Sequence, residues 1–267
     1  VVTLNNGGYV VAWSSDGQDG DEFGVYAQQY DISGVVVNNE FRVNTYITNT
    51  QVSVSATSLN DGGYVITWIS DVQDGDEFGI YAQRYNANGE TVEDEFRVNT
   101  TTTFDQYNPS VTSLNDGGFL IIWVSEHLNE DLATIFAQRY DENGNAIGNE
   151  LQLNSLTAGH GDTGGAYLSP LNDDGFVITW GAPDQNGSGY GVFAQRYNSD
   201  GTAKGNEFKV HTYEYDNQYQ PDIATLSDGS FIIVWTSTAF SEPIGYSSQD
   251  GDFGGIFAQL YDADGST

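Results

Sequence analysis

The sequence predicts an all-β fold, namely a five-bladed β-propeller made of four-stranded antiparallel blades. Three observations predict it. Five tryptophans recur at separations of 55, 55, 57 and 55 residues, an Ala-Gln-x-Tyr motif recurs with them, and each unit contains a glycine-containing turn. Propeller blades have about 40–50 residues, which is close to this period. A linear array of small β-units is the alternative architecture for the same pattern.

Each unit is predicted to contain four short strands. Turns rich in Asn, Asp and Gly separate them, and these residues favour tight hairpins and positive φ. The third strand alternates with period 2, so that Ile80, Ala82 and Arg84 share one face. No stretch has an amphipathic helical pattern over three turns. The strands are expected at residues 64–68, 80–85 and 96–100 in the second unit and, for the first strand, at residues 110–114 of the third.

The landmarks divide the chain into five units, which we predict to form one repeat domain over residues 1–267. The fifth unit lacks the segment equivalent to a fourth strand, so one blade is incomplete or neighbouring sequence supplies the strand. The chain also has no methionine, including at position 1, and we expect it to be a fragment of a longer chain. The predicted units are residues 1–48, 49–103, 104–158, 159–215 and 216–267.

The chain is strongly acidic, with 38 Asp or Glu residues, 7 Lys or Arg residues and a net charge of −31. Such a field repels phosphate backbones and anionic lipid headgroups, so nucleic-acid binding and membrane docking are not expected. No segment approaches the roughly 18 apolar residues that a membrane-spanning helix needs. Cysteine is absent, which excludes disulfides and thiolate chemistry.

The loop between the second and third strands is the main chemical signal. It places several carboxylates on a glycine-rich turn, and Ca²⁺ accepts six to eight oxygen ligands in flexible geometry. The spacing is not that of an EF-hand. A solvated hairpin tip is the alternative interpretation, because Asp and Gly are good turn formers. The candidate calcium ligands are Asp16, Asp19, Asp21, Glu22, Asp71, Asp74, Asp76, Glu77, Asp250 and Asp252.

The recurring arginines and tryptophans are interpreted as residues that hold blade against blade, because they appear once per unit. His127, His160 and His211 fall at unrelated positions, so no catalytic triad or histidine metal site is predicted. Two tyrosines in variable loops, Tyr190 and Tyr246, are the candidates for contact with a sugar.

Three motifs together resemble a tandem repeat of very large secreted bacterial proteins, which are described as calcium-binding, haemolysin-type or adhesin-like. They are residues 60–68 (Asn-Asp-Gly-Gly-Tyr-Val-Ile-Thr-Trp), 79–85 (Gly-Ile-Tyr-Ala-Gln-Arg-Tyr) and 95–100 (Glu-Phe-Arg-Val-Asn-Thr). The resemblance implies secretion, an extracellular or cell-surface location and calcium in the surroundings. It brings no catalytic activity with it.

These observations lead to the expectation of a secreted, surface-associated adhesive or structural propeller that binds Ca²⁺ at the acidic hairpins and is not an enzyme. Surface glycans or other extracellular proteins are the expected partners, and the sequence also allows self-assembly. A carbohydrate-binding lectin is the alternative function. A polysaccharide-active enzyme is the third.

Overall fold

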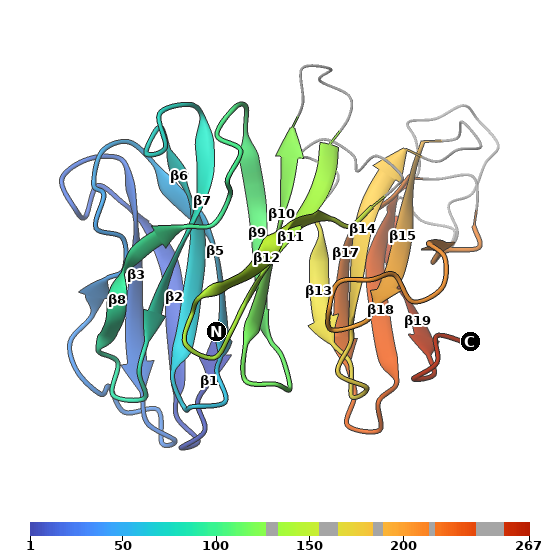
Figure 1. Cartoon of the computed structure of the whole chain (residues 1–267), viewed down its shortest axis with the longest axis horizontal. Helices are drawn as coiled ribbons and strands as arrows, with labels where there is room; N and C mark the ends of the chain where they lie inside the picture. The colour runs from blue at the N-terminus through green and yellow to red at the C-terminus, as the bar shows by residue number, and fades with distance from the viewer. Residues whose placement is uncertain (127–132, 155–164, 184–188, 214–216, 239–253) are drawn as a thin grey trace. The chain divides into compact units, whose positions relative to one another are not determined.

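A computed structural model describes residues 1–126, 133–154, 165–183, 189–213, 217–238 and 254–267 (Figure 1). The described elements are all β-strands, and they form five antiparallel sheets that follow one another along the chain. Four sheets have four strands, while the fifth has three in the part of the chain that is described. Within the described ranges, no helix has the length and apolar character needed to cross a membrane.

The strands pair in chain order within every sheet, as successive hairpins require. Sheet 1 contains β1 (Val2–Thr3), β2 (Tyr9–Asp16), β3 (Phe23–Tyr30) and β4 (Phe41–Arg42). Sheet 2 contains β5 (Gln51–Ser58), β6 (Tyr64–Asp71), β7 (Phe78–Tyr85) and β8 (Thr91–Arg97), and sheet 3 contains β9 (Gln106–Ser113), β10 (Phe119–Glu126), β11 (Ala133–Tyr140) and β12 (Ala146–Gln152). Sheet 4 contains β13 (Tyr167–Pro170), β14 (Phe176–Pro183), β15 (Tyr190–Tyr197) and β16 (Phe208–Lys209), and sheet 5 contains β17 (Asn217–Thr225), β18 (Phe231–Thr238) and β19 (Gly254–Tyr261).

The fourth strands end earlier than the sequence predicts. In sheet 2 the strand stops at Arg97, although residues 96–100 were expected. The side chain of Asn99 explains the difference, because its Oδ1 accepts the Ile80 N–H at 2.8 Å. A side chain therefore replaces the backbone ladder at this point. Asn44 and Asn154 make the same contact with Val25 and Ile135, at 2.7 Å each.

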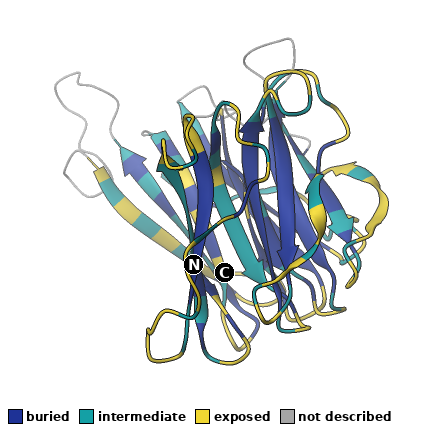
Figure 2. Cartoon of the chain, turned by 90° about the vertical axis from the view of Figure 1, so that its left-hand side faces the viewer, coloured by how far each residue is buried: buried dark blue, intermediate teal, exposed yellow. Residues whose placement is uncertain are grey.

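The chain divides into two compact units, residues 1–125 with 136–151 and residues 126–135 with 152–267. In the first unit, one apolar core joins sheets 1 and 2 and a second joins sheets 2 and 3. In the second unit, the core joins sheets 4 and 5. In sheets 2 and 4 the second and third strands are almost wholly buried, whereas β2 is mostly intermediate and β19 alternates between exposed and intermediate residues (Figure 2). Burial of apolar faces between consecutive sheets is what blades require.

The recurring aromatic residues are packing residues, as the sequence predicts. Trp68 and Trp180 are fully buried. Tyr64 stacks on Tyr85 with ring centroids 4.8 Å apart, and Phe41 of the preceding sheet packs on the same Tyr85 at 5.5 Å. Aromatic pairs of this kind add about 0.5–1.5 kcal/mol beyond the area that they bury.

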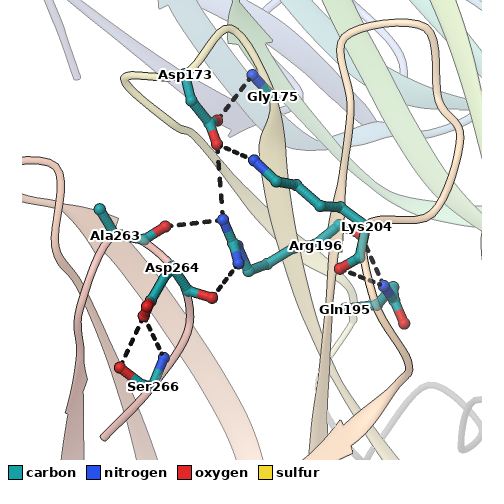
Figure 3. Close-up of polar contacts among 8 residues, drawn as sticks. All are labelled: Asp173, Gly175, Gln195, Arg196, Lys204, Ala263, Asp264 and Ser266. Atoms are coloured by element: carbon teal, nitrogen blue, oxygen red, sulfur yellow. Dashed lines mark hydrogen bonds and ion pairs between the residues drawn. The ribbon is translucent and has the colours of Figure 1, made fainter.

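Two of the recurring arginines, Arg84 and Arg196, join their sheet to the hairpin of the next sheet. In sheet 4, Arg196 donates from Nη2 to the Ala263 carbonyl at 2.8 Å and forms an ion pair with Asp173 at 3.6 Å (Figure 3). Partial burial raises the pKa of Asp173, but hydrogen bonds from Lys204 and from the Gly175 N–H, with the charge of Arg196, bring it below its ordinary value. The carboxylate is therefore held ionised in the folded protein.

His211 occupies a structural position of the repeat. It occupies the repeat position of Asn44, Asn99 and Asn154 in the first three units, directly after a recurring valine or leucine. Its ring is buried, and Nδ1 lies 2.8 Å from the Tyr213 carbonyl oxygen. The residue is thus a variant of a structural asparagine.

Candidate functional site

The acidic loops of sheets 1 and 2 are closed hairpins with one common backbone pattern. The N–H of Gly17 donates to the Glu22 carbonyl at 2.6 Å, and the N–H of Val72 donates to the Glu77 carbonyl at 2.9 Å. The loops follow β2 and β6 directly, so their carboxylates gather at one end of the two hairpins.

Several of the predicted calcium ligands serve as hydrogen-bond acceptors. Asp21 accepts the Asn49 N–H at 3.0 Å, and Asp76 accepts the Phe104 N–H at 3.4 Å. Both donors belong to the segment that leads into the next sheet, so the loop fastens that segment. Contacts of the same kind involve Asp19, Glu22 and Asp74, whereas Asp16 is exposed and Glu77 also has a partner.

Metal binding at these loops stays a prediction. Across the described residues, no group of three or more His, Asp or Glu side chains is placed so that it could hold a metal ion. Asp250 and Asp252 lie outside the described residues. Hydrogen bonds engage several of these carboxylates, whereas Oδ2 of Asp19 is buried and has no hydrogen-bond partner among the described residues.

One carboxyl differs from the others in its surroundings. Asp71, the last residue of β6, lies near Glu22 from sheet 1 and Asp105, which immediately precedes β9 of sheet 3. Burial raises the pKa of Asp71 above its ordinary value, and the charges of Glu22 and Asp105 raise it further. The pKa shift of Asp71 is upward, whereas those of Asp141, Asp173, Asp228 and Asp264 are downward. Three consecutive sheets thus contribute one acidic group each to the electrostatic surroundings of Asp71.

Short contacts fix the positions of these three residues. The Asp71 N–H donates to the Thr50 carbonyl at 2.9 Å, and the Thr50 hydroxyl donates to Oε2 of Glu22. Asp105 accepts the Phe78 N–H on Oδ1 at 3.1 Å. Because Phe78 pairs directly with Asp71 in the sheet, Asp105 and Asp71 meet at the same end of β7. We call Glu22, Asp71 and Asp105 the acidic triad.

Backbone strain flanks the acidic triad on both sides. Val72 has φ +61° and Phe104 has φ +63°, and both are side chains that rarely adopt this left-handed region. In the preceding unit, the same positions hold Gly17 and Asn49, which tolerate it. Val72 is 45% exposed, so the strained position also presents an apolar surface. Strain of this kind clusters at functional sites.

The two predicted sugar-contact tyrosines gain no support as a site. Tyr190 begins β15 and occupies the position of Phe23 and Phe78 in the repeat, which makes it one more recurring aromatic. Its N–H donates to Oδ1 of Asn217 at 2.9 Å, as the Phe78 N–H does to Asp105. Tyr246 lies outside the described residues.

Solved structures share the fold of this chain at low sequence identity. An α-L-arabinofuranosidase of Fusarium graminearum, in complex with arabinobiose, matches with a TM-score of 0.56 and 15% identity over 79% of this chain and 62% of that protein. An α-L-arabinanase of Penicillium chrysogenum, complexed with arabinobiose, matches with a TM-score of 0.55 and 16% identity over 81% of this chain and 64% of that protein. An endo-arabinase of Bacteroides thetaiotaomicron matches with a TM-score of 0.54 and 11% identity over 99% of this chain and 96% of that protein.

The likeness shows the fold, and it confirms the predicted class: the chain is an all-β, five-bladed β-propeller. This chain spans less than two thirds of the length of the two fungal proteins. No protein-family model matches the sequence, and no curated protein matches it either.

The expectation of a non-enzymatic adhesive or structural module is wrong. Solved structures that share the fold include proteins named as an arabinofuranosidase, an arabinanase, an endo-arabinase and a trans-sialidase.

A signal for the acidic triad was nevertheless present in the sequence. Asp105 replaces Thr50 of the preceding unit, Val72 replaces Gly17, and Phe104 replaces Asn49. These substitutions depart from the repeat at adjoining places. Residues that depart from a repeat are better candidates for function than residues that obey it.

Proposed function

We propose that this chain is a polysaccharide-active β-propeller that hydrolyses glycosidic bonds. The observation that carries the proposal is the acidic triad, in which three consecutive sheets bring together one carboxyl of raised pKa and two further carboxylates. Glycoside hydrolysis needs one carboxylic acid that donates a proton and one carboxylate that acts as base or nucleophile. The shared fold of the arabinan-directed proteins supports the same class of reaction.

In the proposed reaction, Asp71 donates its proton to the glycosidic oxygen as the bond from that oxygen to the anomeric carbon breaks. Water supplies the oxygen that joins the anomeric carbon. Its proton passes to the carboxylate of Glu22 or Asp105, both of which are anchored by a hydrogen bond. A raised pKa suits Asp71 to the donor role, because it keeps the proton to a higher pH than an ordinary aspartate does.

The substrate class follows from charge and surface. The net charge of −31 repels uronates and sialylated glycans, so a neutral polysaccharide is favoured. The exposed part of Val72 offers an apolar contact for the C–H face of a sugar ring beside the acidic triad. We therefore propose a neutral polysaccharide such as arabinan as the substrate.

The test is the release of new reducing ends by the purified chain from arabinan, with polygalacturonate as the anionic control. Release from arabinan is expected, and it should disappear in Asp71→Asn. The matched control is Asp16→Asn, which changes the same repeat position in sheet 1 and should leave the rate unchanged. No release from arabinan or from other neutral polysaccharides would overturn the proposal.

A further inference from the structure

A second site lies away from the acidic triad, in a groove between sheets 2 and 3 of the first unit. The groove has a volume of about 870 Å³ and is formed by β8 on one side and by β11, β12 and their hairpin on the other. A volume of roughly 300–1,000 Å³ is typical of ligand sites. We propose that this groove binds a neutral oligosaccharide and that Glu93 and Asp94 determine its specificity.

The end of the groove that contains Glu93 and Asp94 lies far from the acidic triad along the strands, although the lining continues to Thr100 toward the other end of β7. Asp71 pairs with Phe78 at one end of β7, whereas Val92, next to Glu93, pairs with Arg84 near the other end. The six steps from Phe78 to Arg84 correspond to about 20 Å at ~3.3 Å per residue. The Glu93 end of the groove is therefore separate from Asp71, and the inference does not depend on hydrolysis.

The acidic pair in the groove departs from the repeat. At the position of Glu93, the other units have Asn38, Gly148 and Gly205, all with positive φ between 72° and 88°. Glu93 adopts φ +61° at the same place, although glutamate disfavours that region. At the position of Asp94 the other units have asparagine: Asn39, Asn149 and Asn206. Only the second unit carries Glu-Asp, and it carries the pair where the groove lies.

The scaffold also forms no hydrogen bond with the carboxylates of Glu93 and Asp94 in the described part of the chain. Glu95 accepts hydrogen bonds from Thr45 and Gln73, and Glu150 accepts the Thr100 N–H. By contrast, the carboxylates of Glu93 and Asp94 have no hydrogen-bond partner in the described part of the chain. They remain able to accept hydrogen bonds from a ligand.

The rest of the lining suits a sugar. Arg84 lines the groove, is 6% exposed, and its Nε has no hydrogen-bond partner among the described residues. That Nε is enclosed by neighbouring atoms, and Nε2 of the buried Gln138 already donates to the Arg139 and Ile147 carbonyls. The exposed side chain of Asn149 is the accessible amide of the lining. Phe96 and Phe136 are half-buried in the lining and present aromatic surface. Hydroxyls of a neutral sugar can donate to the two carboxylates while other sugar oxygens accept from the Asn149 amide.

Charge and geometry separate this ligand from two others. The lining contains Glu93, Asp94, Glu95 and Glu150 but only two arginines, so an anionic oligosaccharide is repelled. A divalent cation is disfavoured, because no group of three acidic side chains in the described ranges is placed to hold a metal.

The experiment is calorimetric titration of the whole chain with arabinohexaose and cellohexaose as neutral probes and with trigalacturonate as the anionic probe. The variant is Glu93→Gly combined with Asp94→Asn, which installs the residues of sheet 3. It should keep or raise the melting temperature, because glycine removes the strain, while affinity for the neutral probe falls at least about tenfold, or ~1.4 kcal/mol. The matched control, Asn38→Gly in sheet 1, should leave affinity unchanged.

Asp71→Asn separates this inference from the proposed function. Binding that persists in Asp71→Asn while hydrolysis is lost supports both. Binding without any hydrolysis by the unaltered chain overturns only the proposed function. The groove proposal is overturned by equal affinity in the double variant, by the absence of saturable binding of either neutral probe, by equal binding of trigalacturonate, or by Ca²⁺ competing with the sugar.

Discussion

Sheets 1 and 2 follow one sequence plan but differ at a few places that carry the candidate chemistry. Both have the same hairpin between second and third strands and the same Asn-to-strand hydrogen bond. Where sheet 1 has Gly17 and Asn38, however, sheet 2 has Val72 and Glu93, each in a strained conformation. The difference teaches that a shared residue such as Asp71 acquires new surroundings where its neighbours depart from the repeat.

The largest expected effect separates Asp71 from its counterpart Asp16. Asp71→Asn should lower the rate of hydrolysis by about 10²–10⁴-fold, the usual contribution of a general acid, whereas Asp16→Asn should not. With the unaltered chain, the rate should fall as pH rises through the raised pKa of Asp71, because the donor proton is lost there. Initial rates of arabinan hydrolysis, measured for each variant and across pH, test both the effect of the substitution and the pH dependence.

Stability gives an independent reading of the same pair. Because the pKa of Asp71 is raised in the folded chain, its ionised form is disfavoured there, and Asp71→Asn should raise the melting temperature at neutral pH. A lower melting temperature for Asp71→Asn would indicate a structural role and remove it as the acid.

The next prediction concerns the third residue of the Ala-Gln-x-Tyr motif, which is Gln29 in sheet 1 and Arg84 in sheet 2. Arg84 donates from Nη2 to the Glu142 carbonyl at 2.8 Å and pairs with Asp61 at 3.6 Å. Arg84→Gln should therefore reduce the free energy of unfolding by about 1–3 kcal/mol in urea titration. Exposed Arg97→Gln is the control and should change it by less than ~0.5 kcal/mol. If the two substitutions lowered the free energy of unfolding equally, Arg84 would contribute no more to stability than an exposed arginine does.

Exchange of the strained residue should act in opposite directions in the two sheets. Val72→Gly should stabilise the chain by about 1 kcal/mol, which corresponds to ~2–4 °C in melting temperature, since a β-branched residue is strained at positive φ. Gly17→Val should destabilise it by a similar amount. If Val72→Gly left the melting temperature unchanged, the strain would be relieved elsewhere and would lose its value as a marker.

Calcium should produce the smallest effect. Asp21 and Asp76 already accept backbone N–H groups, so millimolar Ca²⁺ is expected to raise the melting temperature by only about 1–3 °C. The variant Asp21→Asn with Asp76→Asn should lose this rise. No rise in the unaltered chain would remove the acidic loops as cation sites.

Much of the fold could be predicted, because the period, the turn residues and the alternation in strands such as β7 are local signals. The early end of β8 could not, since it depends on the Asn99 side chain reaching Ile80 across the sheet. The acidic triad depends on contacts among residues 22, 71 and 105, which belong to three sheets, so no local pattern contains it. The identity of Glu93 was visible in the sequence, but its groove was not.

The contact between Arg84 and the β11–β12 hairpin limits the places where this scaffold can accept an inserted segment. The guanidinium packs against residues 141–145 so closely that a Cβ on Gly144 would lie 2.8 Å from Nη1. Lengthening that turn would break the contact with Arg84 and weaken the packing of sheet 2 against sheet 3. The tip at residues 72–77, where Gly75 has open space around it, is the better place for an engineered insertion, at the cost of the neighbouring chemistry.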